Sequence, residues 1–177
     1  MKKTVIAVIG CGRIANNAHF PAFAKMENIR VKYACDIIKE KADAAKEKFE
    51  FIENVITDYK IALADKEVDA VYVLTPNYVH YTVTMDALRA GKHVLCEKPA
   101  ARTYAEALEM QKVAHETGRM LQIGVVNRFC DNVNHVRKLI ADGELGEVYQ
   151  VYVSFRAHRS IPGLGGDFTQ KAKSGGG

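Results

Sequence analysis

Short apolar runs rich in β-branched residues alternate with helical patterns over roughly the first two thirds of the chain. Six runs have this character, the third being the weakest: Thr4–Gly10, Val31–Asp36, Asn54–Thr57, Val68–Thr75, Lys92–Glu97 and Arg119–Val126. A continuous apolar run is typical of a strand buried on both faces. Strands that alternate with single helices predict right-handed crossovers and a parallel sheet with helices on both sides. The predicted fold class is therefore α/β, a doubly wound parallel sheet.

The ends of several helices can be predicted between these runs. Thr103 and Glu106 form the T-x-x-E pattern of a capping box, which predicts that a helix begins there. Gly118 is placed to end that helix in the left-handed conformation. Pro21 lies inside the first helical pattern, where it either kinks the helix or starts a second short one.

The pattern changes after about residue 124. A helix is predicted over Cys130–Ala141, and residues 146–160 alternate apolar and polar positions, as in a strand with one solvated face. We therefore divide the chain into residues 1–124, the doubly wound domain, and residues 125–177, the incomplete start of a second α/β domain. A sheet reduced to its first strand is not stable alone. Residues beyond about Val126 are accordingly expected to be disordered, rearranged or paired with another copy.

Composition narrows the class of protein. The 177 residues are 48% hydrophobic and carry a formal net charge of +4, with Lys and Arg interspersed among Asp and Glu, so nucleic-acid binding is not predicted. No apolar stretch approaches membrane-spanning length. The four cysteines form no C-x-x-C pair, and the histidines show no metal-ligand spacing. These features predict a soluble cytoplasmic protein without a metal or membrane partner.

A glycine motif follows the first predicted strand. Gly10, Gly12 and Ala15 form G-x-G-x-x-A where a helix begins, which favours a pyrophosphate held by backbone N–H groups. Asp36 ends the second predicted strand 21 residues beyond Ala15, where a carboxylate can bind both hydroxyls of an adenosine ribose. The same charge repels a ribose 2′-phosphate. The sequence therefore predicts NAD as the cofactor, with NADP disfavoured.

Two further motifs follow predicted strands, T-P-N-Y-V-H at residues 75–80 and C-E-K-P-A at residues 96–100. Ligands bind such sheets at the carboxyl ends of the strands. Each motif also has a purely structural explanation. Pro76 and Asn77 can start the next helix, and Glu97 and Lys98 can form a surface ion pair of little energetic value.

The glycine motif, the strand-ending acid, T-P-N-x-x-H and E-K-P, in this order and spacing, resemble the glucose–fructose oxidoreductase/inositol dehydrogenase (Gfo/Idh/MocA) family. The similarity continues through V-N-R-F at residues 126–129 and I-A-D-G-E-L-G-E-V at residues 140–148 to S-G-G-G at residues 174–177. The resemblance implies a Rossmann domain that binds NAD or NADP, followed by an α/β domain for substrate and oligomer contacts. It implies an enzyme that oxidises or reduces a sugar or polyol, and a homo-oligomer in the intact protein.

The resemblance also assigns roles to residues. It makes Lys98 the catalytic residue, in contact with the reacting hydroxyl and the nicotinamide ribose, and it places Asn127 facing the substrate. His80 would support the T-P-N loop, and Pro99 is expected to be cis. The cofactor-binding residues that it implies are Gly10, Gly12, Arg13, Ile14, Asp36, Thr75, Pro76, Asn77, His80, Glu97 and Lys98.

In the family, S-G-G-G precedes a helix that supplies a catalytic Asp and His. The resemblance therefore implies a chain truncated before that segment, which binds cofactor but turns over little substrate. One alternative is a non-catalytic dinucleotide-binding or regulatory module, which would need neither Lys98 nor Asn127. Another is chemistry on a non-sugar substrate, similar to that of biliverdin reductase or dihydrodiol dehydrogenase.

Overall fold

The computed structural model describes residues 3–154, 156 and 170–175. The chain divides into two compact units. One comprises Met1–Gly124 together with Gln170–Gly177, and the other comprises Val125–Thr169.

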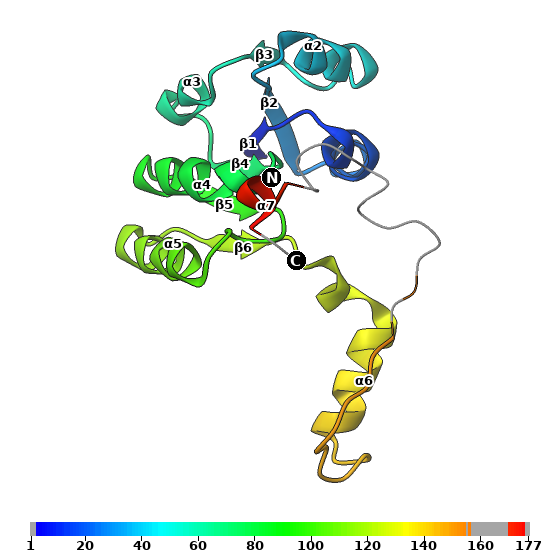
Figure 1. Ribbon diagram of the computed structural model, residues 1–177. Helices are drawn as coiled ribbons and strands as arrows, with labels where there is room; N and C mark the ends of the chain where they lie inside the picture. The colour runs from blue at the N-terminus through cyan, green and yellow to red at the C-terminus, as the bar shows by residue number, and fades with distance from the viewer. Residues whose placement is uncertain (1–2, 155, 157–169, 176–177) are drawn as a thin grey trace. The chain divides into compact units, whose positions relative to one another are not determined.

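Six parallel strands form the sheet of the first unit, in the order β3-β2-β1-β4-β5-β6 (Figure 1). The strands are β1 (Thr4–Ile9), β2 (Ile29–Cys35), β3 (Asn54–Ile56), β4 (Ala70–Val73), β5 (His93–Cys96) and β6 (Leu121–Ile123). The predicted doubly wound parallel sheet is confirmed. The strand order reverses between β1 and β4, and in such sheets the crevice at the carboxyl ends on either side of this point binds the ligand.

Helices cover both faces of the sheet (Figure 1). One face packs against η1 (Ala15–His19), α1 (Phe20–Phe23) and α2 (Lys39–Lys48), and the other against α3 (Tyr59–Ala64), α4 (His80–Arg89) and α5 (Tyr104–Thr117). Successive side chains of β1 point to opposite faces of the sheet and so belong to two separate hydrophobic clusters. The cluster under η1, α1 and α2 contains Ile6 and Val8, and the cluster under α3, α4 and α5 contains Val5, Ala7 and Ile9. Strand β1 is thus buried on both sides, as its uninterrupted apolar sequence requires.

The predicted helix ends are present. The hydroxyl of Thr103 accepts a hydrogen bond from the backbone N–H of Glu106, and the Glu106 carboxylate accepts one from the backbone N–H of Thr103. Gly118 ends the helix in the left-handed conformation, with φ +62°. Pro21 stands in the first turn of α1, which runs on from η1 without a break because His19 and Phe20 both have helical backbone angles, so no separate second helix starts there. The turn before it, η1, is a π-helix, because Pro21 has no N–H to continue an α-helical ladder.

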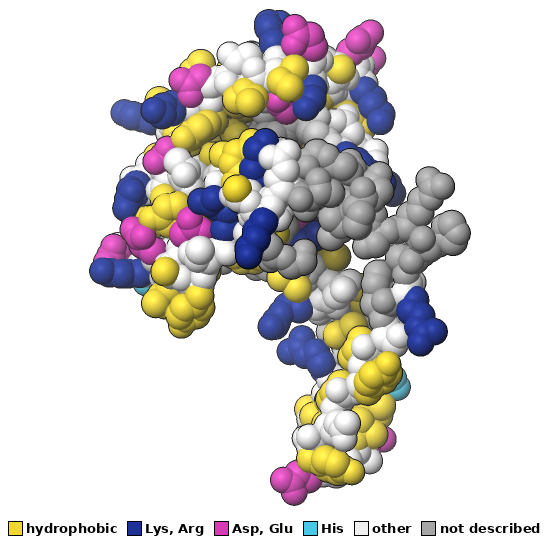
Figure 2. Space-filling view, in the orientation of Figure 1, with side chains coloured by type: hydrophobic (Ala, Val, Ile, Leu, Met, Phe, Trp, Pro, Cys, Tyr) yellow, Lys and Arg dark blue, Asp and Glu magenta, His cyan; other side chains and the backbone are white. Residues whose placement is uncertain are grey.

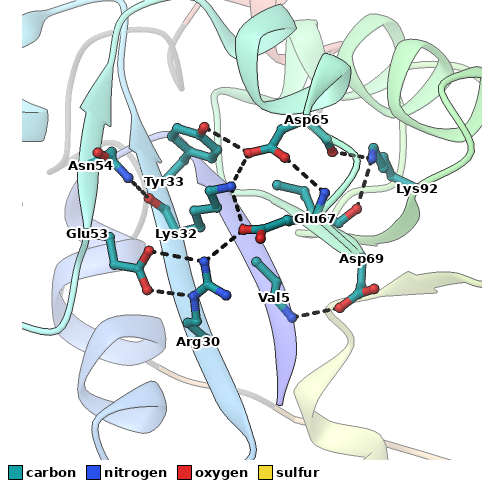
Figure 3. A network of polar contacts seen from close by, with 11 residues as sticks. Val5, Arg30, Lys32, Tyr33, Glu53, Asn54, Asp65, Glu67, Asp69 and Lys92 are labelled. Atoms are coloured by element: carbon teal, nitrogen blue, oxygen red, sulfur yellow. Dashed lines mark hydrogen bonds and ion pairs between the residues drawn. The ribbon is translucent and has the colours of Figure 1, made fainter. Parts of the chain in front are cut away.

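The amino-terminal edge of the sheet is held by a network of charged groups (Figure 3). Lys32 on β2 lies between two carboxylates, with its Nζ 2.5 Å from Asp65 Oδ2 and 2.7 Å from Glu67 Oε2. Arg30 joins the same network through Glu67 at 3.0 Å. The buried ammonium of Lys92 donates to the carbonyl oxygens of Asp65, at 2.7 Å, and of Val68, at 2.9 Å. This network ties the start of β4 to β2.

The second unit contains η3 (Val126–Phe129) and α6 (Asp131–Ala141), which confirms the predicted helix. The strand predicted within residues 146–160 is wrong for the part that the structure describes, because residues 146–154 form neither strand nor helix. An alternating apolar segment becomes a strand only when a neighbouring strand pairs with its backbone groups. Residues 155 and 157–160 of the predicted strand lie outside the described residues.

On the face of the molecule that Figure 2 displays, Lys and Arg side chains are interspersed with Asp and Glu side chains over α2 to α5. Among the described residues, no helix has the length and hydropathy needed to cross a bilayer.

Candidate cofactor and active site

The glycine motif forms a tight turn between β1 and η1. Gly10 has φ +100° and donates to the carbonyl of Cys35 at 2.7 Å, and a Cβ there would lie 2.7 Å from the backbone of Leu74. Gly12 is different, since a Cβ added to it would meet no atom within 4 Å. Gly10 is therefore required by the fold. Gly12 instead keeps open the space beside the backbone N–H groups, which suits a pyrophosphate.

Asn16 fixes this loop, a role that the sequence analysis missed. Its Nδ2 donates to the carbonyl oxygens of Cys11 at 2.8 Å and of Gly12 at 3.0 Å. An amide side chain that bonds the backbone one turn earlier is common at helix starts. The sequence feature that could have predicted this role is an Asn in the first helical turn after a glycine loop.

Asp36 lies beside the glycine loop at the end of β2. Its Oδ2 accepts from the N–H of Cys11 at 3.0 Å, and its Oδ1 accepts from the N–H of Ile38 at 2.9 Å. Each carboxylate oxygen keeps a further lone pair for a ligand hydroxyl. The predicted ribose-binding acid is thus held at a fixed distance from the predicted phosphate site.

Two buried thiols lie under the loop. Burial, followed by the charge of Asp36, raises the pKa of Cys11 and of Cys35 to about 12. Both side chains are therefore protonated at neutral pH and pack as small apolar groups. Cys130, in the second unit, is exposed and does not have this packing role.

His80 connects the two later motifs. It begins α4 after η2 (Asn77–Val79) and is 2% exposed. Its Nδ1 lies 2.7 Å from the carbonyl oxygen of Pro99, and its Nε2 lies 2.8 Å from that of Thr75. The T-P-N loop and the E-K-P loop are thereby held together, although 19 residues separate His80 from Pro99.

Glu97 and Lys98 are not the surface ion pair that was one interpretation of the sequence. Glu97 is 7% exposed, and its Oε1 lies 2.9 Å from Nε2 of His19. Lys98 is exposed, and no hydrogen bond or ion pair of its ammonium group is recorded among the described residues. The Lys98–Pro99 peptide bond is cis, as expected. His19 was missed by the sequence analysis, because its partner lies 78 residues away and no local motif marks it.

The short helix α7 (Lys171–Ser174) packs against the T-P-N loop within the first unit. Nδ2 of Asn77 donates to the carbonyl oxygen of Ser174 at 2.9 Å, and Arg102 donates to that of Ala172 at 3.3 Å. Gly175 ends the helix with φ +87°, a conformation that favours glycine. The first glycine of the S-G-G-G stretch is thus a helix cap.

The other predicted residues divide between the two units. Arg13 and Ile14 are exposed directly after the glycine loop. Pro76 is exposed and precedes η2. Asn127 lies on η3 in the second unit. Within the described ranges, no group of three or more His, Cys, Asp or Glu side chains could hold a metal ion.

These residues fit a dinucleotide. The open space at Gly12 suits phosphates, and the fixed carboxylate of Asp36 suits ribose hydroxyls. In the described part of the chain, the buried hydroxyl of Thr75 has no hydrogen-bond partner. The hydroxyl of Thr84, fully buried on α4, has no partner among these residues either, so the fit rests on the glycine loop and Asp36. Donors and acceptors for the phosphates and a ribose of such a ligand therefore lie along the carboxyl edge of the sheet.

Comparison with known proteins agrees with this geometry. The family described as "Oxidoreductase family, NAD-binding Rossmann fold" (Gfo/Idh/MocA) matches residues 4–125. The chain is 34% identical over 172 residues to D-glucoside 3-dehydrogenase of Escherichia coli (strain K12), covering 97% of this chain and 48% of that protein. It is 31% identical over 147 residues to inositol 2-dehydrogenase of Salmonella typhimurium, a match that covers 82% of this chain and 44% of that protein.

Solved structures show the same fold. The WlbA dehydrogenase from Bordetella pertussis, in complex with NADH and UDP-GlcNAcA, superposes with a TM-score of 0.78 at 29% identity, covering 84% of this chain and 42% of that one. The 3-ketoreductase KijD10 from Actinomadura kijaniata, in complex with NADP and TDP-benzene, superposes with a TM-score of 0.74 at 30% identity. The match covers 80% of this chain and 43% of that one. The chain thus spans less than half the length of these relatives.

Proposed function

Because the chain belongs to the Gfo/Idh/MocA family of NAD-binding oxidoreductases, we propose that it is the cofactor-binding part of an enzyme that transfers hydride to or from a sugar or polyol carbon. The observation that carries this proposal is the gathering of three motifs at one edge of the sheet. His80 holds the T-P-N loop against the E-K-P loop at 2.8 and 2.7 Å, and the glycine loop with Asp36 lies at the end of the neighbouring β1 and β2.

The chain would hold NAD along this edge. The backbone at Gly10 and Gly12 would bind the pyrophosphate with Arg13 and Ile14 beside it, and Asp36 would accept from the adenosine ribose. The nicotinamide end would lie against Thr75, Pro76, Asn77, His80, Glu97 and Lys98. Bound NAD supplies the acceptor or donor of the hydride. Because Asp36 repels a 2′-phosphate, NAD is preferred over NADP.

Lys98 is the proposed catalytic residue. Its ammonium group has no recorded side-chain partner among the described residues, so it can contact a substrate hydroxyl. A positive charge at that place stabilises the negative charge that develops on oxygen when hydride leaves the neighbouring carbon. Asn127 is proposed to contact the substrate from the second unit.

The sugar or polyol class is supported by the names of the relatives, a glucoside dehydrogenase and an inositol dehydrogenase. These 177 residues span less than half of those proteins. We therefore expect the chain by itself to bind cofactor with little turnover. The assignment of residues 125–177 as the start of a substrate domain, and a homo-oligomeric intact protein, are parts of the same proposal.

A titration of the chain with NADH and, in parallel, with NADPH tests the cofactor site. NADH is expected to bind more tightly. Asp36→Asn keeps the shape of the side chain but removes its charge, and should weaken NADH binding about tenfold, the usual effect of a lost hydrogen bond to a charged group. NADPH affinity should not fall in parallel, because the repulsion of its 2′-phosphate is lost as well.

Glu47→Gln is the matched control. It makes the same change of charge at an exposed position on α2 and should leave both affinities unchanged. An amide can accept only one of the two backbone hydrogen bonds that Asp36 accepts, so equal losses of NADH and NADPH affinity would contradict the assigned role where the amides of Cys11 and Ile38 keep their rates of hydrogen exchange in Asp36→Asn. Binding of neither cofactor by the parent chain would reject the cofactor site itself.

A further inference from the structure

His19 and Glu97 form a contact that links the glycine-loop helix to the E-K-P loop. Nε2 of His19 lies 2.9 Å from Oε1 of Glu97, and the two side chains are only 15% and 9% exposed. A carboxylate accepts and never donates, so Nε2 carries the proton of this bond. The pair crosses the point at which the strand order reverses, because η1 follows β1 whereas Glu97 follows β5, on the other side of β4.

The direction of the His19 side chain is set by its surroundings. The π turn of η1 shifts the helix register by one residue just before Pro21. The imidazole ring then packs against a pair of aromatic rings, Phe23 and Tyr72, each with its centroid 6.0 Å away and 4.9 Å from each other. This packing leaves Nε2 facing the carboxylate.

Glu97 passes the contact on to Lys98. Its second oxygen, Oε2, accepts from the backbone N–H of Lys98 at 3.1 Å. The absence of a side chain at Gly124 makes room for the carboxylate, since a Cβ there would lie 3.0 Å from Oε1. Among the described residues, His19 is the only side chain hydrogen-bonded to the carboxylate of Glu97. A buried carboxylate that loses its partner either moves towards water or becomes protonated.

We propose that His19 is a positioning residue for Lys98, acting through the Glu97 carboxylate. His19 holds Glu97, Glu97 holds the backbone of Lys98, and His80 holds Pro99 from the other side at 2.7 Å. The E-K-P loop is thus fixed at both ends while the Lys98 side chain stays free for a ligand. This inference rests on the proposed function, because it concerns the residue proposed to contact the nicotinamide ribose and the reacting hydroxyl.

Two variants of His19 separate positioning from packing. His19→Phe keeps an aromatic ring among Phe23 and Tyr72 but removes the N–H. His19→Gln carries an amide N–H the same number of bonds from the backbone and should restore the contact. His115→Gln, at an exposed position on α5, is the control. A thermal melt of each variant reports whether it is folded.

The first readout needs no cofactor. Hydrogen exchange of the Lys98 amide, followed by NMR in the 177-residue chain, should accelerate about tenfold in His19→Phe and about twofold or less in His19→Gln and His115→Gln. In a Glu97→Ala background, His19→Phe should cause no further acceleration, because the two residues act in series. Unchanged Lys98 exchange in His19→Phe, or additive effects with Glu97→Ala, would overturn the proposal.

The second readout compares NADH with ADP-ribose, which shares the adenosine and pyrophosphate but lacks nicotinamide. His19→Phe should weaken NADH about tenfold and ADP-ribose less than about twofold. Equal weakening of both ligands would show that His19 merely supports the glycine loop, and would reject the positioning role. Should the parent chain bind neither ligand, the proposed function fails, whereas Lys98 exchange still decides the role of His19.

Discussion

At the residue scale, the two glycines of the loop have different reasons for being glycine. Gly10 is excluded from substitution by its φ of +100° and by the Leu74 backbone, 2.7 Å from where a Cβ would be. Gly12 has neither constraint, because its φ is not in the left-handed region and the space around it is open. The first glycine is thus a requirement of folding, and the second belongs to the proposed binding site.

Gly10→Ala and Gly12→Ala test this distinction. We expect Gly10→Ala to lower the free energy of unfolding by about 2–4 kcal/mol, from backbone strain and from the clash with Leu74. Gly12→Ala should change it by less than about 1 kcal/mol but weaken NADH binding, since its Cβ enters the space left for the pyrophosphate. Urea unfolding and NADH titration measure the two effects. Similar stabilities for both variants, or full NADH affinity in Gly12→Ala, would contradict this interpretation.

Buried polar side chains at the site also differ in what sequence can reveal. His80 belongs to a recognisable motif, yet its contact with Pro99 appears only in the folded chain. Glu97 belongs to a motif too, and burial overturns the surface ion pair that its neighbour Lys98 made plausible. A motif in the sequence therefore indicates that a position belongs to the site. The hydrogen-bond partner of its side chain, which only the structure shows, determines its role.

At the scale of the element, α5 has a complete amino-terminal cap. Both halves of the capping box are formed, between the Thr103 hydroxyl and the N–H of Glu106 and between the Glu106 carboxylate and the N–H of Thr103. The helix then contributes Met110, Val113 and Ala114 to the core that it shares with α4. Its cap should therefore contribute measurably to the stability of the first unit.

We expect Thr103→Ala to lower the free energy of unfolding by about 1 kcal/mol, since it leaves a backbone N–H of the first turn without its acceptor. Thr82→Ala is the control, because Thr82 is exposed on α4 and caps nothing, so its effect should stay within about 0.5 kcal/mol. Urea unfolding followed by circular dichroism compares them. Equal effects of the two substitutions would show that the cap does not contribute to the free energy of unfolding.

At the scale of the whole molecule, the two edges of the sheet have different roles. The amino-terminal edge is closed by the network of Lys32, Asp65, Glu67 and Arg30, and the carboxyl edge carries the proposed site. The hydrogen bond from Lys32, followed by the backbone N–H of Glu67, lowers the pKa of Asp65 to about 2. The stability of the first unit should therefore depend on pH in the acid range.

A carboxyl group whose pKa is lower in the folded than in the unfolded state stabilises the fold above its unfolded pKa. That contribution is lost as the pH falls through the folded pKa. The free energy of unfolding should therefore decrease between about pH 4 and about pH 2. Lys32→Met removes the main cause of the shift and should make this decrease shallower, whereas Lys60→Met, at an exposed position on α3, should not. Urea unfolding at several pH values measures the slope, and an unchanged slope in Lys32→Met would contradict the assignment.

The sequence by itself determined those features that depend on residues a few positions apart. The parallel sheet follows from apolar runs separated by single helices, and the helix ends follow from Thr103, Glu106 and Gly118. The glycine loop and Asp36 were also recognisable, because a turn that binds phosphate needs particular residues at fixed spacing. In each case the physical cause lies within one or two elements, where the chain connectivity itself brings the groups together.

Only the tertiary structure decided which distant groups meet. The partners His19 and Glu97 are 78 residues apart, and Lys32 and Asp65 come together only because β2 and the end of α3 share one sheet edge. The strand predicted after residue 146 shows the converse. The segment has the alternating apolar and polar positions of a strand, but its described residues 146–154 do not form a strand. A β-strand needs hydrogen bonds from a second strand, and a segment's own sequence cannot supply that partner.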